Sequence, residues 1–293
     1  MISKYGIFCK VIECGSFTKV AEEISYSQSA ISQSVKSLEQ ELGTTLVTRE
    51  KGGIRLTRDG QGYFPYLQEI YNAEQSLERK YSEMQGLENS LIRIGTYTSI
   101  SRYYLPLVMK AFKEKYPTVK FELHQGDYQD IIQQVKNRQV DFGFTTPSAA
   151  SGLPTKTFFK QELVAILPAG HPLAEKKTVT LADLATEPFI IDDEGKFSLP
   201  LHFFSEAGLT PNIEFHLYDN NSIIIMVEQG LGVSIIDRVF LANTSANIVI
   251  REIEEKPTRL LSACWHNWDT MPIAARKFLK FFLSQPEFQD TPK

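Results

Sequence analysis

Residues 25–43 read SYSQSAISQSVKSLEQELG, and this stretch decides the fold of the N-terminal region. Its apolar residues recur at the spacing of one helix face: Ile31, Val35, Leu38 and Leu42. Ser27 can cap this helix and Gly43 can end it. Seven serines and glutamines crowd its leading end, although serine is only a middling helix former. The polar end is therefore either a solvated face or a surface that contacts a partner.

Two more helices are predicted before this one. Apolar residues at helical spacing predict the first over residues 3–13: Ile7, Phe8, Val11 and Ile12. Gly15 ends that helix and Ser16 caps the next, whose apolar stripe is Phe17, Val20, Ala21 and Ile24. A short turn at residues 25–26 then leads into the helix that Ser27 caps. Two short helices joined by a tight turn, after another helix, are the pattern of a helix-turn-helix.

The segment after the third helix predicts a wing. TTLVTREKGGIRLT (44–57) has two strand-like runs, 46–49 and 54–57, around EKGG. With the apolar stripe of the third helix toward the core, its opposite face carries Gln28, Ser29, Ser32, Gln33 and Lys36. Serine hydroxyls and backbone N–H groups at a helix N-terminus can bind phosphate, and glutamine can pair with an adenine edge. Because the turn and the wing lie at the right offsets, we favour DNA binding over a solvated face.

Residues 8–60 resemble the N-terminal signature of LysR-type transcriptional regulators. The shared elements are Gly15-Ser16-Phe17-Thr18, Ala21, Ile24, residues 27–32, Leu38-Glu39, Leu42-Gly43, Leu46, Arg49, Leu56-Thr57 and Gly60. The family's usual Phe is Val47 here, and its usual Arg is Gly52, which leaves Lys51 or Arg55 as the phosphate contact of the wing. The predicted DNA-binding residues are Ser27, Gln28, Ser29, Ser32, Gln33, Lys36, Arg49, Lys51 and Arg55.

The charge balance limits how the chain can bind DNA. The formal net charge is −4, which argues against a protein that coats nucleic acid nonspecifically. Residues 1–60 carry eight Lys and Arg against seven Asp and Glu, so the N-terminal region has only a slight positive excess. Binding must therefore depend on placed residues rather than on a broad basic surface.

Residues 59–88 predict a long linker helix. Apolar residues follow a 4-3-7-4-3 spacing, with Glu74 at the missing position: Tyr63, Leu67, Ile70, Leu77, Tyr81 and Met84. The stripe can pack on the helix's own domain or pair two subunits, and the resemblance implies pairing, as a dimer or a tetramer. Pro65 predicts a bend, or a helix that starts near it.

The last two hundred residues alternate strands and helices, which predicts parallel α/β sheets. They resemble the effector-binding region of the same family, two Rossmann-like α/β subdomains similar to type 2 periplasmic binding proteins. The segments that carry the resemblance include RIG (93–95), VDFGF (140–144), GHPLA (170–174), AGLTP (207–211) and VEQGLGVSIID (227–237). The predicted domains are 1–58, 59–88 and 89–293, the last divided into subdomain I (89–161 and 267–293) and subdomain II (162–266).

Ligands of open α/β sheets bind beyond the carboxyl ends of the strands, so an effector is expected between the two halves. The predicted effector-binding residues are Thr98, Ser99, Ser101, Thr145, Thr146, Lys196 and Phe197. The resemblance favours Ser99, because a Ser or Thr at this helix cap commonly touches the effector in the family. Ordinary N-capping is an equal alternative for Ser99, and Thr145 can equally be a strand-end residue.

The charge of the effector stays open. Lys196, His202 and Arg238 are candidate counter-ions, whereas the acidic run 192–194 would repel a simple anion. Asp237 stands where the family usually has Pro, which adds a charge beside the predicted cleft.

Two other classes of function compete with a regulator. An enzyme is disfavoured because the chain has no G-x-S-x-G, P-loop or dinucleotide motif. A secreted solute-binding protein is disfavoured by the absence of a signal peptide and by the predicted wing. The three cysteines and five histidines have no metal-ligand spacing, so neither a metal nor a cofactor is predicted. We expect a cytoplasmic regulator without a membrane segment, with double-stranded DNA, a small-molecule effector, a second copy of the chain and RNA polymerase as candidate partners.

Overall fold

The computed structural model describes residues 2–50, 53–84, 90–192, 198–242 and 244–288. The chain divides into two compact units, Met1–Gly86 with Asn137–Gln139, and Leu87–Lys136 with Val140–Lys293. None of the helices in the described residues is both long and apolar enough to cross a membrane. The predicted subdomain limits stay a prediction.

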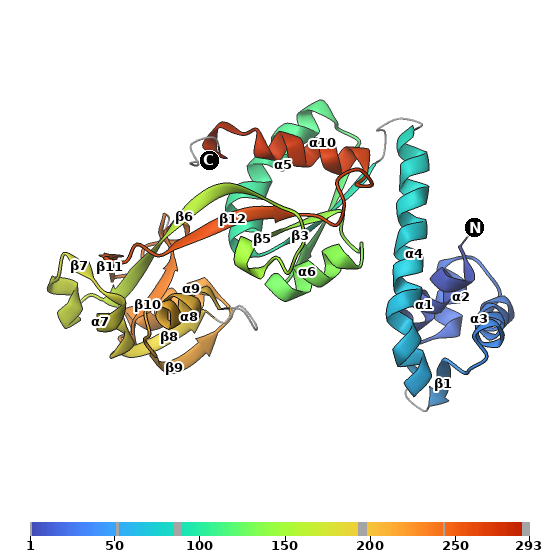
Figure 1. The fold of residues 1–293 in the computed structure, drawn as a ribbon, viewed down its shortest axis with the longest axis horizontal. Coiled ribbons are helices and arrows are strands. Elements are labelled where there is room, and N and C mark those ends of the chain that lie inside the picture. Colours follow the sequence, from blue (N-terminus) through green and yellow to red (C-terminus); the bar gives the residue numbers. More distant parts are fainter. Residues whose placement is uncertain (1, 51–52, 85–89, 193–197, 243, 289–293) are drawn as a thin grey trace. The chain divides into compact units, whose positions relative to one another are not determined.

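The first unit is a winged helix-turn-helix followed by a long helix (Figure 1). Its elements are α1 (Lys4–Cys14), α2 (Phe17–Glu23), α3 (Gln28–Leu42), β1 (Val47–Glu50), β2 (Gly53–Leu56) and α4 (Arg58–Met84). The predicted caps are confirmed: Ser16 and Ser27 accept backbone hydrogen bonds, and Gly15 and Gly43 adopt left-handed conformations. α4 continues through Pro65, so a helix that starts at the proline is wrong.

The core of this unit brings α1, α2, α3 and the start of α4 together. Its buried residues are Ile7, Phe8, Cys9, Val11, Phe17, Val20, Ala21, Ile31, Val35, Leu38, Leu46 and Leu67. The wing is an antiparallel pair in which Val47 lies opposite Leu56. Gly60 is required where α4 meets the wing, because a Cβ there would lie 2.1 Å from the carbonyl oxygen of Leu46.

The second unit consists of two α/β halves. Its strands are β3 (Leu91–Thr96), β4 (Lys120–Gln125), β5 (Phe142–Thr145), β6 (Thr155–Pro168), β7 (Thr178–Val179), β8 (Pro188–Asp192), β9 (Asn212–Leu217), β10 (Ser234–Asp237), β11 (Ile248–Ile253) and β12 (Thr258–Cys264). Its helices are α5 (Leu105–Lys115), α6 (Tyr128–Lys136), α7 (Leu181–Ala185), α8 (Leu199–Glu206), α9 (Asn220–Glu228) and α10 (Ile273–Leu283), with a π-helical turn at Ile100–Tyr104 before α5.

The sheet is mixed rather than purely parallel as the alternation predicted. The strand order is β4-β3-β5-β12-β6-β11-β7, and β10 also pairs with β6. Pairs β3–β4, β3–β5, β8–β9 and β7–β11 are parallel. β12, β11 and β10 run antiparallel to β6, because β6 crosses from one half to the other and the later strands return along it.

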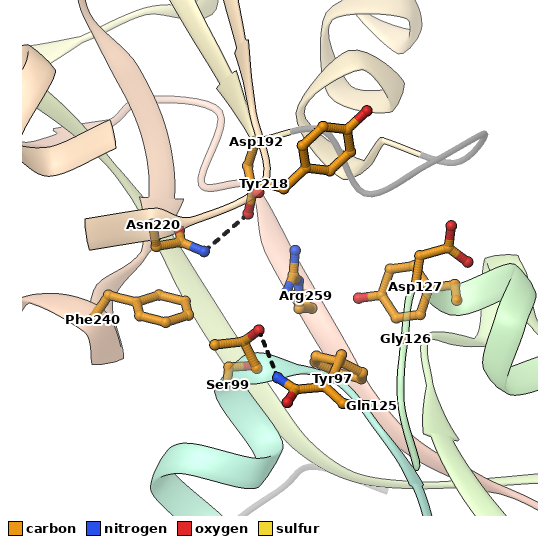
Figure 2. Close-up of a pocket in the computed structure, with 12 residues that line it drawn as sticks. Tyr97, Ser99, Gln125, Gly126, Asp127, Asp192, Tyr218, Asn220, Phe240 and Arg259 are labelled. Carbon is orange, nitrogen blue, oxygen red and sulfur yellow. Dashed lines mark hydrogen bonds between the residues drawn. The ribbon is translucent and has the colours of Figure 1, made fainter. Parts of the chain in front are cut away.

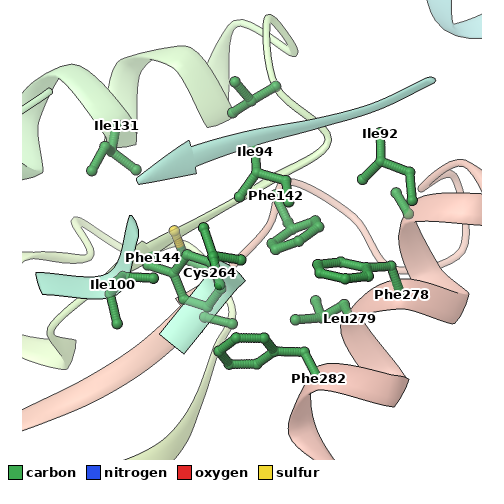
Figure 3. Packing of buried hydrophobic residues seen from close by; sticks show 14 of the residues in the cluster. Ile92, Ile94, Ile100, Ile131, Phe142, Phe144, Cys264, Phe278, Leu279 and Phe282 are labelled. Carbon is green, nitrogen blue, oxygen red and sulfur yellow. The ribbon is translucent and has the colours of Figure 1, made fainter. Parts of the chain in front are cut away.

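Each half has its own hydrophobic core. The core of the first half includes residues of β3, β5, α5, α6 and α10, and the cores of the second half include residues of β7, β8, β10 and α7–α9. Aromatic rings fill the core of the first half, where Phe142, Phe144, Phe278 and Phe282 pack between the sheet and α10 (Figure 3). Cys264 lies in the same core, and its burial raises the pKa of its thiol to about 12. The second half has smaller cores on the two sides of its strands. The largely buried ends of β3 and β8 therefore rest on packed cores, which holds the residues that follow them in place.

Candidate functional site

The recognition surface of the first unit lies on α3. Ile31, Val35 and Leu38 are at most 1% exposed, which fixes the orientation of the helix. The predicted DNA-binding residues on its other side are exposed, except for the half-buried Ser32: Gln28, Ser29, Ser32, Gln33 and Lys36. Ser27 has a structural role as well, because its hydroxyl accepts from the backbone N–H of Ala30 at 3.2 Å. The polar residues predicted to bind DNA and the buried apolar residues therefore lie on different faces of α3.

The carboxylate of Glu39 on α3 holds the start of the wing. Glu39 Oε1 accepts from the backbone N–H groups of Leu46 at 2.8 Å and Val47 at 3.2 Å. On β1 the exposed Arg49 places its guanidinium 4.8 Å from the centroid of the Phe17 ring. Arg55 is exposed on β2, and Lys51 lies outside the described residues. A cation–π contact of this kind limits the positions available to Arg49.

A cavity of about 260 Å³ lies in the second unit, beyond the carboxyl ends of β3, β4 and β8 (Figure 2). The described residues that line it are Tyr97, Thr98, Ser99, Gln125, Gly126, Asp127, Tyr128, Asp192, Tyr218, Asn220, Phe240 and Arg259. The location agrees with the general rule for open α/β sheets. The lining comes from both halves and from the strand β12.

Two of the predicted effector-binding residues line this cavity. Thr98 Oγ1 accepts from Gln125 Nε2 at 3.2 Å. Ser99 is 1% exposed, and among the described residues its hydroxyl has no hydrogen-bond partner. The alternative role of Ser99 as a side-chain cap is wrong, because it makes no capping hydrogen bond to the helical turn that follows. A buried hydroxyl without a hydrogen-bond partner is available to bond to a ligand.

The other predicted effector residues are not among the described residues that line the cavity. Ser101 Oγ donates to the carbonyl oxygen of Thr98 at 3.2 Å. Thr145 and Thr146 are buried, and Thr145 Oγ1 donates to the Thr146 carbonyl oxygen at 3.3 Å. Lys196 and Phe197 lie outside the described residues.

Neither of the two described counter-ion candidates lines the cavity. Arg238 pairs with Glu162 at 3.3 Å and with Glu252. His202 lies 3.4 Å from Glu206 on the exposed side of α8. Among the described residues, the cation that does line the cavity is Arg259 on β12, which was not predicted from the sequence.

Arg259 forms a buried ion pair with Asp237. Arg259 Nη1 lies 3.0 Å from Asp237 Oδ2, and the two residues are 5% and 3% exposed. On β6, Arg259 is opposite Gln161 and Asp237 is opposite Leu163, so β6 brings the two strands β12 and β10 within reach of each other. The guanidinium carbon lies 5.9 Å from the ring centroids of both Tyr97 and Tyr128.

The buried Asp237 also affects the pKa of Tyr104, a residue of the first half. Burial and the nearby charge of Asp237 raise the pKa of Tyr104 to about 12. Its hydroxyl donates to Gln161 Oε1 at 3.5 Å. The unusual Asp237 was the signal in the sequence that pointed here, although its partner Arg259 was not recognised.

Helix α9 positions the far side of the cavity. Asp219 caps it by accepting from the backbone N–H of Ser222 at 3.0 Å. Burial acts to raise the pKa of Asp219, but hydrogen bonds from Ser222 and Asn221 outweigh it and lower that pKa. The first residue of α9, Asn220, donates from Nδ2 to Asp192 Oδ2 at 3.1 Å.

Two family models match the chain. Residues 2–61 match the bacterial regulatory helix-turn-helix protein, lysR family, and residues 85–287 match the LysR substrate binding domain. The chain belongs to the LysR family. The predicted family, fold and regulatory function are therefore confirmed, and the chain is a DNA-binding transcriptional regulator with an effector-binding domain.

Similar proteins cover the chain almost end to end or in large part. The transcriptional dual regulator GltC of Bacillus subtilis is 32% identical over 227 residues, 76% of each chain. The transcriptional activator CmpR of Synechocystis is 28% identical over 98% of this chain and 96% of its own. The crystal structure of HinK, a LysR family regulator from Pseudomonas aeruginosa, superposes with a TM-score of 0.59 at 26% identity, covering 96% of this chain and 97% of that one. These relatives are regulators rather than enzymes.

Proposed function

We propose that the chain binds double-stranded DNA as a dimer through α3 and the wing, and that an effector in the cavity beyond β3, β4 and β8 changes this binding. The observation that carries the proposal is the division of α3 into a fully buried stripe and an exposed polar face. Gln28, Ser32 and Gln33 would face the bases, and Lys36, Arg49 and Arg55 would contact phosphates. A DNA target supports action in the cytoplasm.

The surface of α4 supports a dimer. Four large apolar residues of the predicted heptad row are exposed: Tyr63 39%, Ile70 41%, Leu77 71% and Tyr81 69%. Leu67 of the same row is buried in the core of the first unit, so the helix uses part of its stripe internally. An exposed apolar row of this length is typical of a surface that a partner helix covers. A dimer would present two copies of α3 to a site with two-fold symmetry, and a tetramer and RNA polymerase remain further candidate partners.

The cavity supports the effector. It is lined by residues from both halves of the second unit, among them the buried Ser99 with its unpartnered hydroxyl. The effector binding domain of QuiR, which superposes with a TM-score of 0.60, was solved in complex with shikimate. A ligand that contacts both halves would bind one arrangement of them more tightly, and this difference in affinity is what can shift the equilibrium of the DNA-binding heads.

A gel-shift experiment tests the proposal. The full chain is mixed with a labelled duplex from the region upstream of its own gene, and unlabelled duplexes of the same or unrelated sequence compete. We expect the related duplex to compete at much lower concentration than the unrelated one. Equal competition by both duplexes would show that the binding is nonspecific and would contradict the proposal.

A further inference from the structure

The charges around the cavity are unevenly balanced. Among the described residues that line it, the ionisable carboxylates are Asp127 and Asp192, and the cation is Arg259. Asp237, which is not in the described lining, pairs with Arg259 at 3.0 Å, so the positive charge of the arginine is already matched. Figure 2 shows Arg259 near the middle of the lining, with Asp192 above it and Asp127 to one side. Among the described residues that line the cavity, the carboxylates therefore outnumber the cation.

Aromatic rings provide much of the remaining surface. Tyr97 and Tyr128 meet edge to face, with centroids 5.1 Å apart, on one side of the cavity. Phe240 and Tyr218 belong to the other half of the unit, and Tyr218 is 77% exposed at the rim. Aromatic faces together with carboxylates are the surroundings that favour a positively charged nitrogen.

Neutral polar groups complete the site. The buried Ser99 hydroxyl and the side-chain amides of Gln125 and Asn220 can donate to oxygen atoms of a ligand. Figure 2 shows Ser99 and Gln125 below Arg259 and Asp192 above it, so one ligand can meet a carboxylate at one end and neutral donors at the other. Asn220 lies at the Asp192 end, where its Nδ2 donates to Asp192 Oδ2 at 3.1 Å. The cavity volume of about 260 Å³ suits a small metabolite.

From these observations we infer that the effector carries a positively charged amine, as a zwitterion of the amino-acid type or as a simple amine, rather than being a plain anion. The inference rests on the proposed effector role of the cavity. Asp192 or Asp127 holds the amine, Ser99 donates to an oxygen of the ligand, and Asp237 determines specificity because it neutralises Arg259. A plain anion would have to bind Arg259 in competition with Asp237 and close to two carboxylates.

The test uses sets of compounds that share one carbon skeleton. Each set contains an L-amino acid, the α-hydroxy acid in which a hydroxyl replaces the amine, and the primary amine that lacks the carboxylate. The melting temperature of the full chain is measured with each compound at equal concentration. We expect at least one amine-bearing compound to raise the melting temperature and its hydroxy acid to leave it unchanged. A greater shift from the hydroxy acids, or no shift from every amine-bearing compound, would overturn the inference.

Charge-removing variants sharpen this test. Asp192→Asn is expected to weaken the binding of the amine-bearing compound by about 10- to 100-fold, the range for losing a charged hydrogen bond. Asp127→Asn is a second such variant that folds reliably, because the Asp127 carboxylate caps α6 through the N–H of Asp130 and asparagine caps equally well. Glu206→Gln on α8, outside the lining, is the matched control and is expected to change nothing. Unchanged affinity in both Asn variants would overturn the assignment.

A substitution of Asp237 is expected to favour the hydroxy acids instead of the amine-bearing compounds. Asp237→Asn removes the negative charge that matches Arg259, so the hydroxy acids should gain affinity relative to the amino acids. An unchanged preference would remove Asp237 from the specificity argument. Gel shifts of the same proteins keep the two proposals apart: intact specific DNA binding with no amine preference defeats only the ligand class, whereas loss of specific DNA binding by the unaltered chain defeats the proposed function.

Discussion

The polar face of α3 and the cavity of the second unit are both polar surfaces, but they relate to the hydrophobic core in opposite ways. On α3 one continuous stretch supplies the exposed residues, and none of Gln28, Gln33 or Lys36 contributes to the core. The cavity is lined by segments that range from Tyr97 to Arg259 along the chain, and several of its residues are almost fully buried. Substitutions on α3 should therefore change binding alone, whereas substitutions in the cavity should change stability as well.

The largest loss of operator affinity is expected from a substitution on α4, because a dimer would bind DNA through two copies of α3 at once. Leu77→Asp places a charge at an exposed position of the apolar row and should separate the subunits. Loss of simultaneous binding by two heads is expected to weaken operator binding by about 10²- to 10⁴-fold. Sedimentation velocity and gel shifts on the same samples measure the two changes together.

Gln75→Asp is the matched control for this prediction, since it adds the same charge two residues earlier and outside the predicted heptad row. It should leave both the subunit assembly and the operator affinity unchanged. A Leu77→Asp protein that is still dimeric would mean that α4 does not carry the interface.

The next largest effect is expected at the buried ion pair. Arg259→Met leaves Asp237 buried without its partner cation, which should destabilise the second unit by about 3–5 kcal/mol. The measurement is urea unfolding followed by tryptophan fluorescence. Both tryptophans of the chain, Trp265 and Trp268, belong to the second unit, so the signal reports on that unit.

A double variant separates the lost charge partner from lost packing. Asp237→Ala combined with Arg259→Met removes both charges and should recover most of the lost stability, because an apolar replacement of a buried pair is often neutral. Additive losses in the double variant would indicate that Arg259 stabilises the unit by packing instead. DNA binding of the soluble variants should be specific in either case.

The third prediction concerns the exposed polar face of α3. Gln28→Ala and Ser32→Ala should each weaken operator binding by about 1–3 kcal/mol, the cost of one lost base contact. Because neither residue belongs to the core, the unfolding free energy should stay within about 0.5 kcal/mol of the parent. Ser37→Ala, at another exposed position of α3, is a control that is expected to keep full affinity. Unchanged operator affinity in both variants would remove this face from the DNA interface.

The same contrast explains what could be predicted from the sequence. Helix α3 is local: its stripe of Ile31, Val35 and Leu38 and the caps Ser27 and Gly43 all fall within one short stretch, and the structure confirms them. The ion pair of Arg259 with Asp237 depends on how β12 and β10 both pair with β6, which no spacing along the chain reveals. The antiparallel return of these strands was missed for the same reason. A buried Arg within an apolar strand gives no periodic signal of its own.

The smallest effect is expected at Asp219, where the cavity depends on an ordinary helix cap. Asp219→Ala removes the acceptor for the N–H of Ser222 and should destabilise the second unit by about 1 kcal/mol. Asp219→Asn keeps a capping acceptor and should retain most of that stability at neutral pH. Tryptophan fluorescence during urea unfolding measures both variants.

The pH dependence of this effect follows from the lowered pKa of Asp219. A carboxylate whose pKa is lower in the folded than in the unfolded chain contributes stability that is fully present above the usual value of 3.8 and is lost as the pH falls through the lowered value. The stability difference between the parent and Asp219→Asn should therefore shrink as the medium is acidified below 3.8, because the parent loses its charge while asparagine has none to lose. A difference that stays constant over this range would mean that the carboxylate charge contributes nothing to the cap, and that its geometry alone holds Asn220 and the cavity wall in place.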